Sequence, residues 1–115
     1  MMILNGAIMA QCLEDTQRKC EYDQVEVGGK YNLTTIVVTI TSREKKLVFK
    51  DFKNNDSTQY AITECYVTEN ALIYECINTK HFKTYSLIFG NNEFDRHLII
   101  TCAGRPLFKF KKDKE

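Results

Sequence analysis

Residues 58–77, TQYAITECYVTENALIYECI, open a series of short apolar runs separated by turn signals. The series continues with FKTYSLIF (82–89), RHLIITC (96–102) and LFKFKK (107–112). Runs of this length, rich in β-branched and aromatic residues, are typical of antiparallel strands joined by hairpins. A helix would instead need apolar residues at three- and four-residue spacing over longer windows. The stretch therefore predicts an antiparallel β-meander.

The faces of the first hairpin follow from the alternation of side chains along a strand. A short loop at Glu69-Asn70 places Cys65 and Cys76 on one face and Glu64 opposite Glu75 on the other. Like charges directly opposite each other destabilise a strand pair unless water reaches them, so the cysteine face is expected to be the inside. On this interpretation the candidate ligand contacts of the interior are Thr63, Cys65, Tyr74 and Tyr85.

Strict alternation also gives the outer face of this hairpin a large apolar content. The residues assigned to that face are Tyr60, Ile62, Tyr66, Ile73 and Ile77. An apolar patch of this size is uncommon on a solvated surface and indicates a covered one. We expect the cover to be either residues 1–20 or a protein partner.

The chain before the meander divides into an N-terminal arm and further strands. Residues 1–24 are expected to form an arm or short helix, of which 1–10 (MMILNGAIMA) are apolar and too few to span a membrane. A remnant of a secretory signal is the alternative for 1–10. Strand candidates follow at 25–27, 31–42 and 47–52. The fold predicted for residues 25–112 is all-β, a meander of about eight strands forming a small up-and-down barrel.

Bulk properties are those of one globular domain. The 115 residues have a net charge of +1, and 43% are hydrophobic. Such a balance favours neither nucleic acid nor an acidic partner. Five cysteines in a small β protein indicate an oxidising compartment, so we expect a secreted or periplasmic protein. The disulfide candidates are Cys12, Cys20, Cys65, Cys76 and Cys102.

Motifs for catalysis or metal binding are missing from the sequence. There is no Cys-x-x-Cys pair, no Gly-rich phosphate loop and no His-x-x-x-His pair. His97 and Cys102 are a conceivable nucleophile pair, but nothing in their spacing supplies an orienting third group. We therefore predict no catalytic residues, no metal site, no cofactor and no enzymatic activity.

Aromatic and lysine residues alternate in two segments, Phe49-Lys50-Asp51-Phe52-Lys53 and Phe108-Lys109-Phe110-Lys111. That pattern suits base stacking with phosphate contacts on an OB-like barrel. It is also the pattern of any half-buried strand. Nucleic-acid binding is kept as a third hypothesis.

Three short motifs resemble those of the lipocalins. Gly29-Lys30-Tyr31 opens the long strand, Phe82-Lys83-Thr84-Tyr85 opens a later one, and Gly104-Arg105-Pro106 follows Cys102. Tyr31 stands where that family has Trp. The resemblance implies a small barrel that carries a hydrophobic ligand, with the Arg105 guanidinium over the Tyr31 ring.

Two functions follow from a small barrel with an apolar outer face. The first is a non-enzymatic secreted or periplasmic binding protein that acts through a protein–protein interface, as an inhibitor or host-directed factor, or through self-association. The second is a lipocalin-like carrier of a small hydrophobic ligand in the interior.

Overall fold

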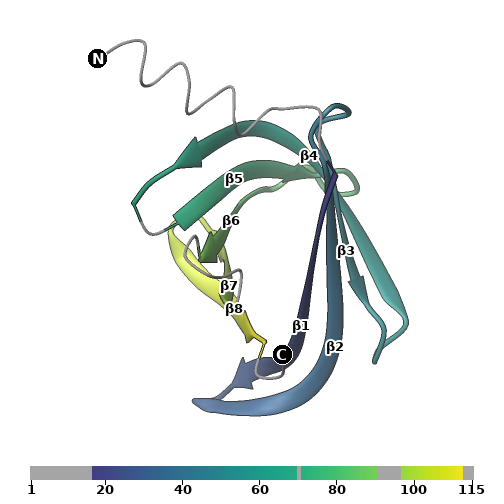
Figure 1. The fold of residues 1–115 in the computed structure, drawn as a ribbon, viewed down its shortest axis with the longest axis vertical. Helices are drawn as coiled ribbons and strands as arrows, with labels where there is room; N and C mark the ends of the chain where they lie inside the picture. The colour runs from purple at the N-terminus through teal and green to yellow at the C-terminus, as the bar shows by residue number, and fades with distance from the viewer. Residues whose placement is uncertain (1–16, 70, 91–96, 113–115) are drawn as a thin grey trace.

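The computed structural model describes residues 17–69, 71–90 and 97–112. They form eight antiparallel strands that close into one barrel in chain order (Figure 1). The strands are β1 (Gln17–Val27), β2 (Lys30–Thr41), β3 (Lys46–Asp51), β4 (Asp56–Val67), β5 (Ala71–Asn78), β6 (Thr84–Gly90), β7 (His97–Cys102) and β8 (Arg105–Lys111). The predicted all-β meander of eight strands is confirmed.

The first strand begins at Gln17, earlier than the expected boundary at residue 25. Residues 17–24 therefore belong to the barrel wall and not to an N-terminal arm. Cys20 and Tyr22 show why, because both side chains are buried and pack in the core. The expected arm or helix in 1–16 lies outside the described residues. No helix within the described ranges is long and apolar enough to cross a membrane.

Local sequence sets the hairpin between β1 and β2. Val27 pairs with Lys30, so the loop has two residues, Gly28 and Gly29. Their φ angles are 59° and 85°. A tight hairpin turn of this kind needs positive φ at both central residues, which glycine adopts without steric cost. The Gly-Gly pair in the sequence is thus the signal for this turn.

The interior is filled by side chains that alternate inward along each strand. In β5 every second residue from Leu72 to Asn78 is buried. Leu47, Leu87 and Leu98 have no exposed surface at all. Closure into a barrel leaves few strand edges, which are otherwise sites of aggregation. The seam is narrow, however, since β1 and β8 pair only at Gln24 with Lys111 and at Val25 with Phe110.

A β-bulge in β4 changes which residues face the interior. The pairing of β4 with β5 shifts between Ile62 and Glu64, so Thr63 is an extra residue without a partner in the ladder. A bulge of this kind makes two successive residues of one strand oppose a single residue of its neighbour. Thr63 is accordingly exposed, and its hydroxyl donates a 3.0 Å hydrogen bond to the Glu75 carbonyl.

The bulge corrects the predicted faces of the hairpin. Tyr60 and Ile62 were assigned to the outer face, but they are 7% and 5% exposed and belong to the core. Thr63 was assigned to the interior and lies outside. Strict alternation failed because the extra residue moves everything before it in β4 to the opposite face. The expected outer cluster is reduced to Tyr66, Ile73 and Ile77.

The remaining part of the hairpin prediction is confirmed. Glu64 lies directly opposite Glu75, and Cys65 and Cys76 are both fully buried on the inner face. Cys76 and Cys102 carry free thiols, and no two described cysteines are bonded to each other. Any predicted disulfide that involves Cys12 lies outside the described residues.

The cation over the Tyr31 ring is Lys111, with its Nζ 4.3 Å from the ring centroid. The expected contact was with Arg105, which instead opens β8 opposite Cys102. The reason is the register of β8, which pairs with β1 only through its last residues, Phe110 with Val25 and Lys111 with Gln24. Arg105, at the start of β8, pairs only with Cys102 of β7.

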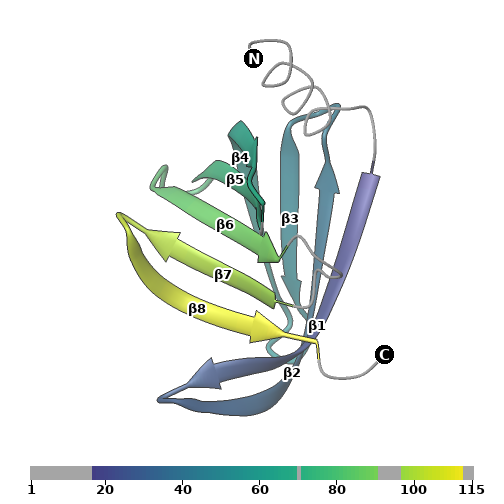
Figure 2. The ribbon, with the colours of Figure 1, turned by 60° about the vertical axis from the view of Figure 1, so that its left-hand side comes forward.

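The meander places four hairpin turns at one end of the barrel, those between β1 and β2, β3 and β4, β5 and β6, and β7 and β8. We call this the open end. Figure 2 shows three of these turns, those of β1–β2, β5–β6 and β7–β8, projecting to the same side of the molecule.

Candidate ligand-binding cavity

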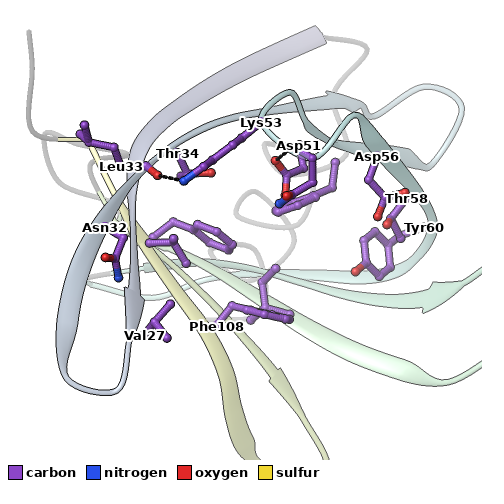
Figure 3. Close-up of a pocket in the computed structure, with 15 residues that line it drawn as sticks. Val27, Asn32, Leu33, Thr34, Asp51, Lys53, Asp56, Thr58, Tyr60 and Phe108 are labelled. Atoms are coloured by element: carbon purple, nitrogen blue, oxygen red, sulfur yellow. Dashed lines mark hydrogen bonds between the residues drawn. The ribbon is translucent and has the colours of Figure 1, made fainter.

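A cavity of about 650 Å³ enters the barrel at the open end (Figure 3). Its inner part is formed by core side chains of five strands, namely Val25, Phe49, Tyr60, Ile100 and Phe110. Its mouth is formed by hairpin residues, namely Val27, Asn32, Leu33, Thr34, Asp51, Lys53, Asn54, Asp56, Thr58 and Phe108. Ligand sites in proteins commonly measure about 300–1,000 Å³ and combine apolar walls with a few polar groups.

Aromatic rings form the wall on the β8 side. The Phe110 ring centroid lies 5.4 Å from that of Phe49 and 6.0 Å from that of Phe108. Separations of this size are usual for favourable aromatic pairs. Phe110 is buried whereas Phe108 is half exposed at the mouth. The rings thus give a continuous apolar surface from solvent to the core.

Polar groups at the mouth come from the β3–β4 hairpin. The Lys53 Nζ reaches across to β2 and donates to the Leu33 carbonyl at 3.1 Å, as Figure 3 shows. The Asp51 carboxylate accepts from the Asn54 backbone and side-chain amides at 3.1 and 2.8 Å. Asp56, directly opposite Asp51, accepts from the Ser57 amide at 2.9 Å. These bonds fix the hairpin and so fix the width of the mouth.

Tyr60 contributes a neutral hydroxyl to the cavity wall. Burial, together with smaller effects of the neighbouring Tyr85 and Cys76, raises its pKa to about 12. Its ring meets the Tyr85 ring edge-on with a centroid distance of 5.6 Å. At neutral pH the hydroxyl is protonated, so it can donate a hydrogen bond to a ligand.

The pKa of Cys76 is also raised to about 12, mainly by burial and then by Glu75. Folded Tyr60 and Cys76 thus hold their protons more tightly than the unfolded chain, with ordinary values of 10.0 and 9.0. Stability from this source is fully present below about pH 9 and falls as pH rises towards about 12, because the unfolded chain ionises first.

We therefore expect urea unfolding to show a steep loss of stability on the alkaline side of about pH 9. The double variant Tyr60→Phe and Cys76→Ala should lose less stability than the parent chain between about pH 9 and about pH 11. Equal losses in the two proteins would mean that these two groups do not control the alkaline limit.

The interior residues predicted from sequence lie away from the cavity. Cys65 and Tyr74 are buried but do not line it, and Thr63 is exposed in the bulge. Tyr85 is half-buried and reaches it only through its contact with Tyr60. The residues that line it include Phe49, Phe108 and Phe110, which the sequence pointed to as stacking platforms for nucleic acid. Their alternation with lysine is the sequence signal that could have identified them as lining residues, because the apolar residues of an alternating strand point into the barrel.

Candidate chemical groups elsewhere are not brought together. His97 and Cys102 lie at opposite ends of β7, too far apart for a hydrogen bond along an extended strand. Glu64 and Glu75 are adjacent on the outer wall, where they accept hydrogen bonds from the hydroxyls of Tyr66 and Ser86 respectively. The bond to Glu64 raises the pKa of Tyr66. Among residues 17–69, 71–90 and 97–112 no cluster of side chains could hold a metal ion.

Comparison with known proteins supplies no relative for this barrel. No family model, no curated protein and no solved structure matches the chain.

Proposed function

We propose that this chain is a non-enzymatic binding protein that holds a small apolar or amphipathic ligand in the cavity at the open end. The observation that carries the proposal is the cavity of about 650 Å³, which joins the solvent to the aromatic part of the core. This is the role that the lipocalin resemblance implies. The closed eight-stranded barrel is compatible with it, and membership of that family remains part of the proposal.

The alternative function, a protein interface on the wall of the β4–β5 hairpin, has less support. It was predicted from five apolar residues, of which Tyr60 and Ile62 point into the barrel. Of the remaining three, Ile73 and Ile77 are only partly exposed, and Tyr66 alone is exposed. A secreted or periplasmic location, with a disulfide, stays a prediction that rests on the number of cysteines.

The ligand proposal is tested by a substitution in β4 that reduces the volume of the cavity. Thr58 faces the cavity opposite Phe49, whereas the next residue, Gln59, points to solvent. We expect Thr58→Trp to weaken binding of the neutral probe N-phenyl-1-naphthylamine at least about tenfold, because the indole occupies the ligand volume. Gln59→Trp adds the same ring outside the barrel and should leave the affinity unchanged.

Probe fluorescence measures both affinities, and circular dichroism checks that each variant is folded. Aliphatic alcohols can be added as competitors of the probe. Each additional methylene in the alcohol should lower the concentration that is needed to displace the probe. Binding that is equal in Thr58→Trp and Gln59→Trp, or absent in the parent chain, would contradict a ligand role for this cavity.

A further inference from the structure

Exposed apolar side chains gather at the open end. The hairpin segments 26–33, 50–57, 79–84 and 102–108 form this end, and we call them together the rim. In the described part of the chain, eight large hydrophobic side chains are exposed, and seven of them belong to the rim. The seven are Val27, Tyr31, Leu33, Phe52, Phe82, Leu107 and Phe108. The exception is Tyr66 in the wall.

The rim is basic although the chain as a whole is nearly neutral. Its six basic side chains are Lys30, Lys50, Lys53, Lys80, Lys83 and Arg105, and its three acidic ones are Glu26, Asp51 and Asp56. The two aspartates already accept hydrogen bonds within their own hairpin. The net charge of the rim is therefore about +3, compared with +1 for the whole chain. Basic and apolar side chains alternate around one opening.

The β5–β6 turn holds a phenylalanine outward at some conformational cost. Phe82 is 75% exposed and has a φ of 61°, in the left-handed region that bulky residues avoid. Its amide donates to the Asn78 carbonyl at 2.8 Å. The buried Asn78 side chain accepts from the amides of Lys80 and His81 at 2.7 and 3.2 Å. A strained, well-anchored residue that presents its ring to solvent indicates a functional contact.

We propose that the rim docks on an anionic lipid bilayer, with the apolar tips of the hairpins inserted between lipids and the basic side chains against the headgroups. The inference goes beyond ligand binding and does not depend on it. Docking in this orientation would place the cavity mouth against the membrane, since Val27, Leu33, Lys53 and Phe108 belong to both.

A bilayer fits the rim better than a protein surface does. The exposed apolar side chains stand on separate turns around an opening, with lysines between them, and do not form one flat patch. A fluid interface can receive separate apolar wedges, and it binds helices and loops that combine such residues with lysine. The charge is complementary, because anionic headgroups attract basic segments by an amount equivalent to about fivefold in affinity for each Lys or Arg.

Vesicle sedimentation tests the charge part of the proposal. The full-length chain should bind vesicles of phosphatidylcholine with phosphatidylglycerol, bind pure phosphatidylcholine much more weakly, and lose affinity with added salt. Lys80→Glu with Lys83→Glu should weaken binding at least about twentyfold. The matched control, Arg18→Glu with Lys19→Glu, makes the same change of charge on the wall of β1 and should keep most of the binding.

Single tryptophans test the orientation, because the chain contains none. Trp at position 52 or 82 (Phe52→Trp, Phe82→Trp) should show a blue-shifted emission with vesicles and quenching by brominated lipid chains. Tyr66→Trp in the wall should show neither. These substitutions keep an aromatic ring at exposed positions, so the fold is not at risk.

Any of three results would overturn the proposal. The first is equal loss of vesicle binding in the rim and wall charge variants, and the second is equal binding to anionic and to pure phosphatidylcholine vesicles. The third is quenching at position 66 that matches the quenching at positions 52 and 82. Binding of the probe in the cavity is measured without vesicles, so failure of membrane docking and failure of ligand binding are separate outcomes.

Discussion

Deletion of Ala61 is expected to unfold the barrel, whereas deletion of Thr63, two positions along the same strand, is expected to be tolerated. In the regular part of β4, Ala61 lies outside between the inward-facing Tyr60 and Ile62. Without Ala61, the side chains in one half of β4 must exchange their inward and outward positions. Tyr60 would then face water and Gln59 would face the core.

The expected cost of the Ala61 deletion is about 4 kcal/mol or more. Exposing a buried Tyr side chain lowers the free energy of unfolding by about 1.5–3 kcal/mol. Burying an unpaired polar side chain lowers it by about 1–3 kcal/mol more. Other residues of β4 that pair with β3, such as Thr58, would be displaced in the same way.

Deletion of Thr63 should instead leave the inward and outward faces of β4 unchanged. The residues on either side, Ile62 and Glu64, then alternate as an ordinary strand with Ile62 inside and Cys65 inside. The chain loses one hydrogen bond from the Thr63 hydroxyl, worth about 1 kcal/mol, and the local twist of the bulge. The free energy of unfolding of the two deletion variants, measured in urea, tests this prediction. If the Thr63 deletion is the more damaging of the two, the bulge is not where the structure places it.

The second large effect is expected from Ile62→Glu, with Ile73→Glu as its matched control in the same hairpin. Ile62 is 5% exposed in the core, so the new carboxyl would be buried. A fully buried carboxyl has its pKa raised by about 3–5 units, which corresponds to about 4–7 kcal/mol at neutral pH. Ile73 is only partly buried and lies on the outer wall beside Tyr66 and Ile88.

We expect Ile62→Glu to be unfolded at neutral pH and to recover part of its structure in acid, where the carboxyl is neutral. Ile73→Glu should remain folded, with a loss of about 1 kcal/mol. Circular dichroism and thermal unfolding measure both. Similar stability in the two variants would show that both isoleucines lie on one face, as strict alternation of the sequence implies.

The sequence by itself determined the class of fold. Dense β-branched runs, the Gly28-Gly29 turn and the approximately ten-residue spacing of the turn signals are local properties, and local backbone preferences suffice to predict strands and hairpins. The opposition of Glu64 and Glu75 followed from the same reasoning, because it depends only on one short loop. The interior position of Cys65 and Cys76 followed from the charges of those glutamates.

The tertiary structure decided the rest, beginning with the bulge at Thr63. A bulge has no strong sequence signal, and a shift of one residue moves every side chain before it to the other face. Tyr60 and Ile62 were assigned to the wrong face for this reason, and the proposed protein interface lost support with them. The start of β1 at Gln17 was also missed, because its polar residues face solvent while Cys20 and Tyr22 are held inside by the closed barrel.

The cavity and the rim depend on closure. Val25, Phe49, Tyr60, Ile100 and Phe110 are far apart in the chain, and only the closing of β8 onto β1 brings them around one space. The rim likewise joins four hairpins that no sequence window contains. From the sequence its residues were assigned to separate strands and turns, and Lys50, Phe52, Lys53 and Phe108 were singled out only as candidate contacts to nucleic acid. Their common position is a consequence of the antiparallel meander, which returns every second turn to the same end of the barrel.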